Sequence, residues 1–332
     1  MRLPDFQYVV PRSTEEACLF LKDHEKESKI LAGGTDLLPS MKQRIVRPAY
    51  LVHIQDIPEL NQIEFSEQSG LRIGALVKLC TLERHPVILD RYPLISQTAA
   101  EVGSVQIREM GSVGGNLSLD TRCYYYNQSS SWRKCRPLCI KMGGEKCNAI
   151  GGGKRCFAAF CADLAPSFIA LGATIKLLSS KGERILSLSN FYTGDGAKPL
   201  AIEPDEVLVE VQVPAFPPNK VVGTYLKYRI RNSFDFPLAS VAAVLTFNSK
   251  KEMCQEAKVV IGAVGTKPDE VKKIGELLKE RRLEGPVIKE ASELAFQAAK
   301  PIANQGSTPS YRKRMIKILT AKALQRALRG GQ

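Results

Sequence analysis

Hydrophobic residues along this chain recur with helical spacing in some segments and with the spacing of strands in others. Residues 15–26 show the helical period, and the apolar run at 29–33 predicts a short strand that ends in glycines. Mixed elements continue to about residue 118, which is typical of a lobe that combines helices with a sheet. Further predicted elements are a helix at 36–44, strands at 50–54 and 70–76, and a helix at 87–102.

The mixed pattern resumes after a cysteine-rich stretch. Residues 164–179 predict a helix that runs into a strand, and 207–214 alternates as a strand that ends at a proline. The segment 215–220, AFPPNK, has two adjacent prolines and no period, and it predicts a lobe boundary. Three later apolar runs fit either sheet strands or a buried helix, and charged helices follow them. The runs are 224–231, 239–247 and 257–265, and the helices are 268–281 and 286–299.

The C-terminal run, 310–330, is a basic amphipathic segment. Its apolar stripe consists of Met315, Ile316, Leu319, Ala323 and Leu328. A helix that docks on the protein and keeps a solvated basic face explains this pattern better than a contact with nucleic acid. We therefore expect no nucleic-acid partner here.

Two glycine-rich turns offer backbone N–H groups to an anion. The first is Gly33 and Gly34 with Thr35 and Asp36, where either of the last two residues is suited to cap the next helix. The second is 111–118, GSVGGNLS. One such turn alone is more often an ordinary strand-to-helix connection, but two in one lobe suit a diphosphate held from both sides. No Rossmann fingerprint opens the chain, so a flavin site of another type is the better hypothesis.

Length and composition set wide limits on the class of protein. The 332 residues, 44% of them hydrophobic, are enough for two or three packed lobes. No secretion signal and no uninterrupted apolar run of membrane length are visible, so we expect a cytoplasmic chain with no membrane contact. Nine cysteines in such a chain argue against disulfides.

Six of the nine cysteines crowd one short basic stretch. The other three, Cys18, Cys80 and Cys254, fit small core residues. Within 121–161 a single acid, Glu145, accompanies eight basic residues, which contribute much of the net charge of +13. They are Arg122, Arg133, Lys134, Arg136, Lys141, Lys146, Lys154 and Arg155.

A bound metal would explain how this stretch folds. It has few large apolar residues to bury, and a structural metal supplies folding free energy in such segments. Because no CxxC pair is present, neither a zinc ribbon nor a ferredoxin run is recognisable. Residue chemistry alone leaves zinc, an iron–sulfur cluster and no metal open.

The glycine turns belong to a wider resemblance. AGGTDLLP and QIREMGSVGGNL, then DLAPSFIALGATIKL, VLVEVQVP and YLKYRIRNSFDFPLASVAA, resemble the flavoprotein subunits of the xanthine oxidase and carbon monoxide dehydrogenase family over nearly the whole chain. The resemblance implies an α+β fold: an FAD-binding domain with two α/β subdomains, and a C-terminal α+β domain. Its implied limits are 1–216 for the FAD-binding domain, with subdomains 1–55 and 56–216 and an inserted loop at 119–160, and 220–332 for the C-terminal domain.

The family also implies which residues contact FAD. The first turn would wrap the diphosphate and ribityl chain, the second would close over the other side, and the remaining residues would contact the rest of the flavin. A lysine near the isoalloxazine would stabilise negative charge on the reduced ring. The implied residues are Lys29, Ile30, Leu31, Ala32, Gly33, Gly34, Thr35, Asp36, Val102, Gly111, Ser112, Val113, Gly114, Gly115, Asn116, Asp163, Leu208 and Lys227. Taken without the resemblance, Val102 and Leu208 fit plain core positions and Lys227 a solvated one.

The cysteine stretch resembles one branch of that family. TRCYYYNQS and the spacing that follows resemble the flavoprotein subunits of 4-hydroxybenzoyl-CoA reductases, whose inserted loop holds a 4Fe-4S cluster. That resemblance implies the ligands Cys123, Cys139, Cys147 and Cys156. Cys135 and Cys161 lie outside the pattern, although Cys135 is close enough to Cys139 to be an alternative ligand.

The implied function is electron transfer on behalf of partner subunits. Molybdopterin and 2Fe-2S centres would belong to a large and a small partner, since no 2Fe-2S run is present here. An acidic ferredoxin would supply low-potential electrons for reductive dehydroxylation of 4-hydroxybenzoyl-CoA to benzoyl-CoA. No catalytic residue is expected in this chain. The alternatives are a hydroxylase subunit for another aromatic or heterocyclic substrate and, more remotely, a zinc-stabilised nucleic-acid-binding protein.

Overall fold

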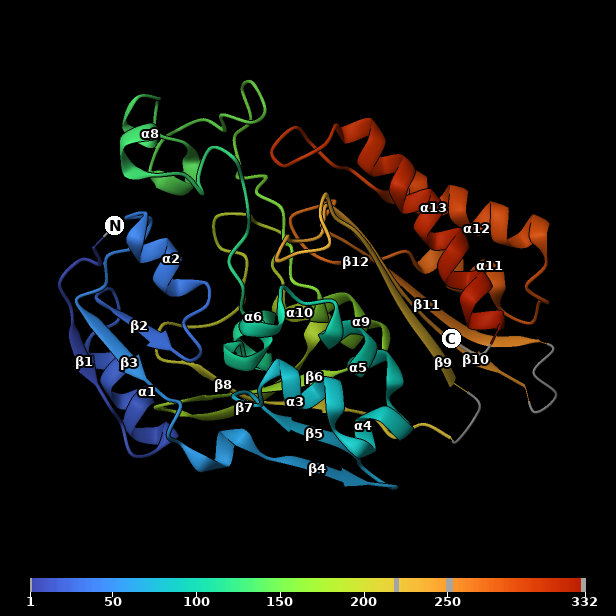
Figure 1. Cartoon of the computed structure of the whole chain (residues 1–332), viewed down its shortest axis with the longest axis horizontal. Coiled ribbons are helices and arrows are strands. Elements are labelled where there is room, and N and C mark those ends of the chain that lie inside the picture. The colour runs from blue at the N-terminus through green and yellow to red at the C-terminus, as the bar shows by residue number, and fades with distance from the viewer. Residues whose placement is uncertain (1, 218–220, 249–252, 330–332) are drawn as a thin grey trace.

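Three sheets, one in each of three lobes, organise the chain (Figure 1). The computed structural model describes residues 2–217, 221–248 and 253–329. Part of the predicted boundary segment, 218–220, and the last residues of the predicted C-terminal domain, 330–332, lie outside the described residues.

The first lobe is a three-stranded parallel sheet with two helices. Its strand order is β1, β3, β2, and Leu51 of β3 is the register partner of both Tyr8 and Lys29. Ser13 caps the first helix, because its hydroxyl accepts a hydrogen bond from the backbone N–H of Glu16. The elements are β1 Gln7–Val9, α1 Thr14–Asp23, β2 Ser28–Leu31, α2 Leu37–Lys42 and β3 Tyr50–His53.

The second lobe is an antiparallel sheet covered by short helices. The strand order is β4, β5, β8, β6, β7. The strands are β4 Ile63–Ser66, β5 Gly70–Gly74, β6 Thr174–Ser179, β7 Gly182–Ser187 and β8 Val207–Val213. The helices are the 3₁₀ helix η1 Pro58–Asn61, α3 Leu79–Arg84, α4 Pro86–Arg91, α5 Pro93–Ala100, α6 Val105–Met110, α7 Val113–Leu117, α9 Leu164–Ala170 and α10 Leu188–Phe191. Between α7 and α9, the insert contains only α8 Ser130–Lys134 and the 3₁₀ helix η2 Ile140–Met142.

The third lobe packs three helices on one face of an antiparallel sheet. The strand order is β12, β11, β10, β9, and α13 lies along β9 and β10 beside α12 (Figure 1). The strands are β9 Val221–Tyr228, β10 Ala239–Phe247, β11 Cys254–Gly262 and β12 Asp269–Glu270. The helices are α11 Lys272–Leu278, α12 Gly285–Ala298 and α13 Pro309–Leu328.

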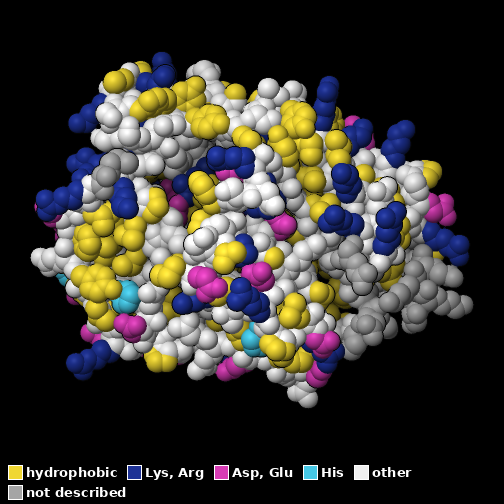
Figure 2. All heavy atoms as spheres, in the orientation of Figure 1, with side chains coloured by type: hydrophobic (Ala, Val, Ile, Leu, Met, Phe, Trp, Pro, Cys, Tyr) yellow, Lys and Arg dark blue, Asp and Glu magenta, His cyan; other side chains and the backbone are white. Residues whose placement is uncertain are grey.

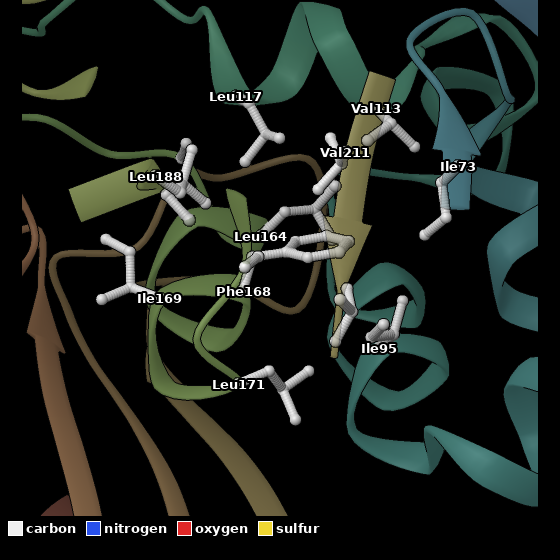
Figure 3. Packing of buried hydrophobic residues seen from close by; sticks show 14 of the residues in the cluster. Ile73, Ile95, Val113, Leu117, Leu164, Phe168, Ile169, Leu171, Leu188 and Val211 are labelled. Carbon is white, nitrogen blue, oxygen red and sulfur yellow. The ribbon is translucent and has the colours of Figure 1, made fainter. Parts of the chain in front are cut away.

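The second and third lobes share one hydrophobic core around α9. Ala242 and Val244 of β10 join the cluster that contains Phe168 of α9, whereas Val241 and Leu245 face the cluster beneath the C-terminal helices. Figure 3 shows Phe168 among the leucines and isoleucines of this cluster. The sheet of the third lobe is therefore buried on both faces, which fixes how the two lobes are placed.

Burial on both faces also explains why the sequence did not distinguish strands from a buried helix in the three later apolar runs. A strand covered on both sides is apolar at nearly every position, so its period of two disappears. The runs 224–231, 239–247 and 257–265 belong to strands β9, β10 and β11, except that 229–231 lie beyond the end of β9 and 263–265 beyond the end of β11.

Two predicted helices differ from the structure. The helix predicted at 87–102 is two helices that meet at Tyr92, because Pro93 cannot donate the backbone hydrogen bond that a continuous helix needs. The helix predicted at 268–281 is shortened to α11, since Asp269 pairs with Ile261 as an edge strand. Cys80, predicted to lie in the core, is only partly buried and its thiol donates to a carboxylate oxygen of Glu109.

Basic side chains gather over the insert and the C-terminal helices (Figure 2). Lysine and arginine side chains surround the insert at the upper left of Figure 2. Among the residues that the structure describes, no helix has the length and apolar character needed to cross a bilayer.

Candidate functional site

The first glycine turn leads from β2 into α2. Gly34 has φ of +69°, a conformation that favours glycine. Asp36 occupies the N-cap position of α2, but its side chain caps no backbone N–H, so the expectation that it caps this helix is wrong. Its carboxylate pairs with the guanidinium of Arg122 instead. Upstream, Lys29 is exposed, and Ile30 and Ala32 pack against the core of the first lobe.

The second glycine turn lies directly against the first. A Cβ atom on Gly33 would stand 1.8 Å from the carbonyl oxygen of Met110, and one on Gly111 would stand 3.7 Å from Oγ1 of Thr35. The first distance is far inside van der Waals contact, so only glycine permits this approach. The structure therefore brings together the two turns that the sequence singled out.

The helix after the second turn begins in equally tight surroundings. The hydroxyl of Ser112 accepts a hydrogen bond from the N–H of Gly115 at 3.2 Å and so caps α7. A Cβ on Gly114 would stand 2.8 Å from Cβ of Ala75. Close packing on Ala75, the residue directly after β5, thus fixes the direction in which this turn presents its backbone.

Asp163 at the start of α9 connects the second turn with the third lobe. Its Oδ1 accepts hydrogen bonds from Nζ of Lys227 at 3.0 Å and from the hydroxyl of Tyr225 at 2.8 Å. Oδ1 of Asn116, within the second turn, accepts a hydrogen bond from the N–H of Leu164 at 3.2 Å. Three of the predicted FAD contacts, Asn116, Asp163 and Lys227, therefore meet at one end of α9.

Burial controls the charges in this group. It raises the pKa of Asp163, and the Lys227 ammonium and the Tyr225 hydroxyl oppose that rise. Burial and the neighbouring carboxylate raise the pKa of Tyr225 well above its usual value, so its hydroxyl stays a neutral donor. The Lys227 side chain is 1% exposed, which rules out a solvated strand position. Because Asp163 offsets its charge, Lys227 offers a flavin less net positive charge than the sequence alone implies.

Three further predicted contacts are core residues. Val102, Val113 and Leu208 are at most 5% exposed and belong to the core shared by the second and third lobes. Lys227 also donates to the carbonyl of Glu101 at 2.7 Å, which places Val102 next to the Asp163 group. Leu208 reaches this core from β8, which contacts α7.

Arg122 connects the first glycine turn, the insert and the third lobe. Its guanidinium pairs with Asp36 and stacks on the ring of Phe236, 4.4 Å from the ring centroid. Its backbone pairs with Ala159 at the other end of the insert. The sequence placed Arg122 only among the basic residues of the insert, since its two partners are far away along the chain.

The four cysteines predicted as ligands line one small pocket in the insert. The pocket is enclosed by Cys123, Cys139, Cys147 and Cys156, with Tyr126 among the neighbouring residues. Burial raises the pKa of Cys123 to about 11, and the other three thiols add to the rise, as expected of sulfur atoms that lie close to it. Burial likewise raises the pKa of Cys156.

The two remaining cysteines of the stretch do not reach this pocket. Cys135 is exposed and its thiol donates to the carbonyl of Ser131. Cys161 is fully buried in a separate apolar cluster, where Nε2 of Gln305 donates to its sulfur at 2.8 Å. The structure thus separates the six cysteines into four that line the pocket and two that do not, and the role of the four as ligands stays a prediction.

The pocket does not have the form of a single-ion site. Among the described residues, no three His, Cys, Asp or Glu side chains are grouped so that they could hold a metal ion. A tetrahedral zinc with bonds of about 2.3 Å to sulfur would need the thiols close around one point. The free volume is about 20 Å³, so a cluster would require the thiols to rotate outward. The 4Fe-4S cluster stays a prediction.

Polar anchors, rather than an apolar core, hold the insert on the protein. The Arg133 side chain donates to the carbonyls of Gln43 and Arg44 beyond the end of α2. Lys141, whose side chain is 5% exposed, pairs with Asp120 at 2.5 Å and lies over the Tyr126 ring beside the four cysteines. In the sequence both cations look like ordinary surface charge, because no local pattern of residues indicates their carbonyl and carboxylate partners.

The other basic residues of the insert form an exposed surface. They are Lys134, Arg136, Lys146, Lys154 and Arg155, all exposed to solvent and none in an ion pair among the described residues. We call these five residues the basic face. Arg122, Arg133 and Lys141 therefore hold the insert on the protein, and the five residues of the basic face remain available to a partner.

Comparisons with known proteins give matches over both parts of the chain. Residues 4–216 match the family model described as "FAD binding domain in molybdopterin dehydrogenase", and 224–327 match the "CO dehydrogenase flavoprotein C-terminal domain". The aldehyde oxidoreductase FAD-binding subunit of Escherichia coli is 31% identical over 73% of this chain and 76% of its own. The glyceraldehyde dehydrogenase medium chain of Sulfolobus acidocaldarius is 27% identical over 97% of this chain and 98% of its own.

Solved structures agree with these matches. Reconstituted CO dehydrogenase from Oligotropha carboxidovorans superposes with a TM-score of 0.81 at 27% identity, over 99% of this chain and 100% of that one. Quinoline 2-oxidoreductase from Pseudomonas putida 86 gives a TM-score of 0.78 at 25% identity, over 99% of each chain.

Replacing Gly33→Ala tests the contact between the two glycine turns. The added methyl would push against the Met110 carbonyl and separate the turns, so we expect FAD affinity to fall by about tenfold or more, equivalent to about 1.4 kcal/mol. The FAD-to-protein ratio after gel filtration measures it. Gly285→Ala is the matched control, since its methyl meets no atom within 4 Å. Equal flavin content in both variants would contradict the prediction.

Replacing Arg122→Met tests whether the insert supports the first turn. The change leaves the Asp36 carboxylate unpaired beside the backbone that faces an anion, so we expect FAD to bind about tenfold more weakly. Arg84→Met is the control, because it breaks only the exposed pair with Glu109. Fluorescence titration of the apoprotein with FAD gives both dissociation constants, and an unchanged constant in Arg122→Met would refute the link.

Proposed function

Because this chain belongs to the family of FAD-binding subunits of molybdopterin dehydrogenases, we propose that it carries electrons between a low-potential donor and the redox centres of partner subunits. The subunit belongs to an oxidoreductase and binds FAD. When bound, FAD exchanges electrons singly or in pairs and so connects carriers of both kinds.

The proposed FAD site is the joined pair of glycine turns with the Asp163 group. Backbone N–H groups of both turns would hold the diphosphate, and glycine at the contact allows the required approach. Lys227 and Asp163 would lie along the flavin as a neutral pair that positions polar atoms without adding net charge. The proposed contacts are those of the sequence prediction, with Val102 and Leu208 as apolar walls.

We further propose a 4Fe-4S cluster held by Cys123, Cys139, Cys147 and Cys156. One observation carries this proposal: these four cysteines line one pocket, and Cys135 and Cys161 do not. A cubane takes one thiolate on each of its four irons, so four cysteines at one pocket match its number of ligands. Lys141 beside the pocket supplies a positive charge that offsets an anionic cluster.

The basic face is the proposed entry point for electrons. Its five cations suit an acidic carrier such as ferredoxin, which would be steered to the insert by charge. Partners that hold molybdopterin and 2Fe-2S centres would receive electrons from the flavin. Relatives described as CO dehydrogenase medium chain and nicotinate dehydrogenase FAD-subunit are named as parts of larger enzymes, which supports such partners.

The proposed overall reaction is reductive dehydroxylation of 4-hydroxybenzoyl-CoA to benzoyl-CoA. Its support is the cysteine insert, because inward electron flow needs a low-potential entry site on this subunit. The second candidate is a hydroxylase for another aromatic or heterocyclic substrate, with electrons leaving through the insert. Relatives named for nicotinate and caffeine favour that candidate.

Single replacements of the four cysteines by serine test the cluster. We expect each of Cys123→Ser, Cys139→Ser, Cys147→Ser and Cys156→Ser to lose most of about four irons per chain, because a serine oxygen is a poor ligand for this cluster. Cys135→Ser and Cys161→Ser serve as matched controls and should keep their iron. Iron and zinc analysis of the purified complex decides between the metals. Wild-type iron in Cys139→Ser, or zinc in the native chain, would overturn the proposal.

The same variants test the direction of electron entry. In the complex, turnover with reduced ferredoxin should collapse in Cys139→Ser, while turnover with a small dye that reaches the flavin directly should persist. High salt should slow only the ferredoxin reaction, because it screens the basic face. Equal losses with both donors would mean that the insert supports folding alone.

Purification of the tagged chain from its native host tests the proposed assembly. We expect two unlike chains in equal amount with it, one carrying molybdenum and one carrying 2Fe-2S centres. Mass spectrometry and metal analysis of the eluate check both. A chain that elutes alone and still turns over an aromatic acyl-CoA would contradict the assignment.

A further inference from the structure

A second and larger pocket borders the end of the insert. It has a volume of about 490 Å³, within the range of about 300–1,000 Å³ usual for small-molecule sites. The end of the insert, the turn at 193–194, and the loops at 264–269 and 300–304 of the third lobe all line it. Neither glycine turn borders this pocket, so it is separate from the proposed FAD site.

One part of this pocket is apolar and aromatic. Phe157, Ile261, Val264 and Ile302 contribute side chains to its wall. Arg155 lies over the Phe157 ring, 4.8 Å from its centroid, so the charged part of the pocket adjoins this wall. A flat heterocycle is the kind of group that such a wall accepts.

The charged part of the pocket is strongly positive. Arg155, Lys267 and Lys300 line it, and none of the three forms an ion pair among the described residues. Asp269 is the one acid in the lining, and it pairs with none of them. A pocket with this excess of unpaired cations attracts an anion.

A buried guanidinium strengthens this field. Arg312 is 0% exposed, and its three hydrogen bonds go to the backbone carbonyls of Leu238, Ile302 and Ala263 rather than to a carboxylate. Burial lowers the pKa of this group accordingly. A buried cation without a counter-charge is costly, and an anion in the pocket would supply one.

Hydrogen-bond acceptors in the pocket select for more than charge. Asn304 is 1% exposed and donates through Nδ2 to the carbonyl of Phe157, but its Oδ1 is buried with no partner among the described residues. Asp269 adds a second free acceptor. A ligand that fits both must carry hydroxyl or N–H donors as well as its negative charge.

We propose that this pocket binds a nucleoside phosphate. The phosphate would face Lys267 and Lys300 within the field of the buried Arg312, the base would lie on the apolar wall by Phe157, and the hydroxyl or N–H groups would donate to Asp269 and Asn304. This inference does not rest on the cysteine cluster or on FAD, because none of its residues is a proposed ligand of either; Arg155 is the lining residue that it shares with the basic face. Since Phe157 also borders the cysteine pocket, the nucleotide would bind next to the insert.

Calorimetric titration of the FAD-saturated complex with ADP and with inorganic pyrophosphate tests the site. We expect one ADP per chain beyond FAD, and at least tenfold weaker binding to the Lys267→Gln/Lys300→Gln variant. Lys272→Gln/Lys289→Gln, with the same charge change at exposed positions of the same lobe, should bind as wild type. Pyrophosphate should bind at least tenfold more weakly than ADP, because it cannot use the apolar wall.

Hydrogen exchange gives a second measurement that does not depend on a variant's folding. ADP should slow exchange at 264–269 and 300–304 of the wild-type complex and leave 29–36 unchanged. The proposal is overturned if ADP does not bind, if the Lys267→Gln/Lys300→Gln variant binds as wild type, if both double variants lose binding equally, or if pyrophosphate binds as tightly as ADP.

Discussion

The ion pair between Asp163 and Lys227 is the contact on which the arrangement of the lobes depends. Asp163 begins α9 in the second lobe, and Lys227 belongs to the sheet of the third, so the pair connects two lobes that also share one hydrophobic core. Both side chains are at most 3% exposed, and removing one partner of such a pair typically costs about 3–5 kcal/mol. Tyr225 completes the shell of Asp163, and Asn116 fixes the same helix end from the second glycine turn.

Tight contacts at the glycine turns and polar contacts at the insert complete the site by different means. The turns meet because Gly33 has no side chain, a constraint of excluded volume. The insert has few buried apolar residues and is held by Arg122, Arg133 and Lys141, each with named oxygen partners. Ion pairs and hydrogen bonds therefore hold the insert in place, whereas apolar burial holds the elements around α9. These three cations also connect the region of the cysteine pocket with that of the first glycine turn.

The two pockets beside the insert differ in chemistry, and this difference gives the subunit two separate surfaces. The small pocket is lined by four cysteines together with Lys141 and Tyr126. The larger pocket combines unpaired cations with an apolar wall. Phe157 borders both. If the small pocket holds a redox centre and the larger one a nucleotide, the negative charge of the nucleotide would lie close to the redox centre, because Phe157 borders both pockets.

Sequence alone determined the features that lie close together along the chain. The two glycine turns, the four-and-two division of the cysteines and the docking helix, which forms as α13, follow from local spacing and from the family motifs. Tertiary structure decided the rest. The apolar run at 239–247 is a strand only because the two core clusters cover it on both faces. Arg122 contacts Asp36 of the first glycine turn, 86 residues upstream, and Phe236 of the third lobe, more than a hundred residues downstream. Such contacts depend on how distant segments pack, and no local pattern of residues records them.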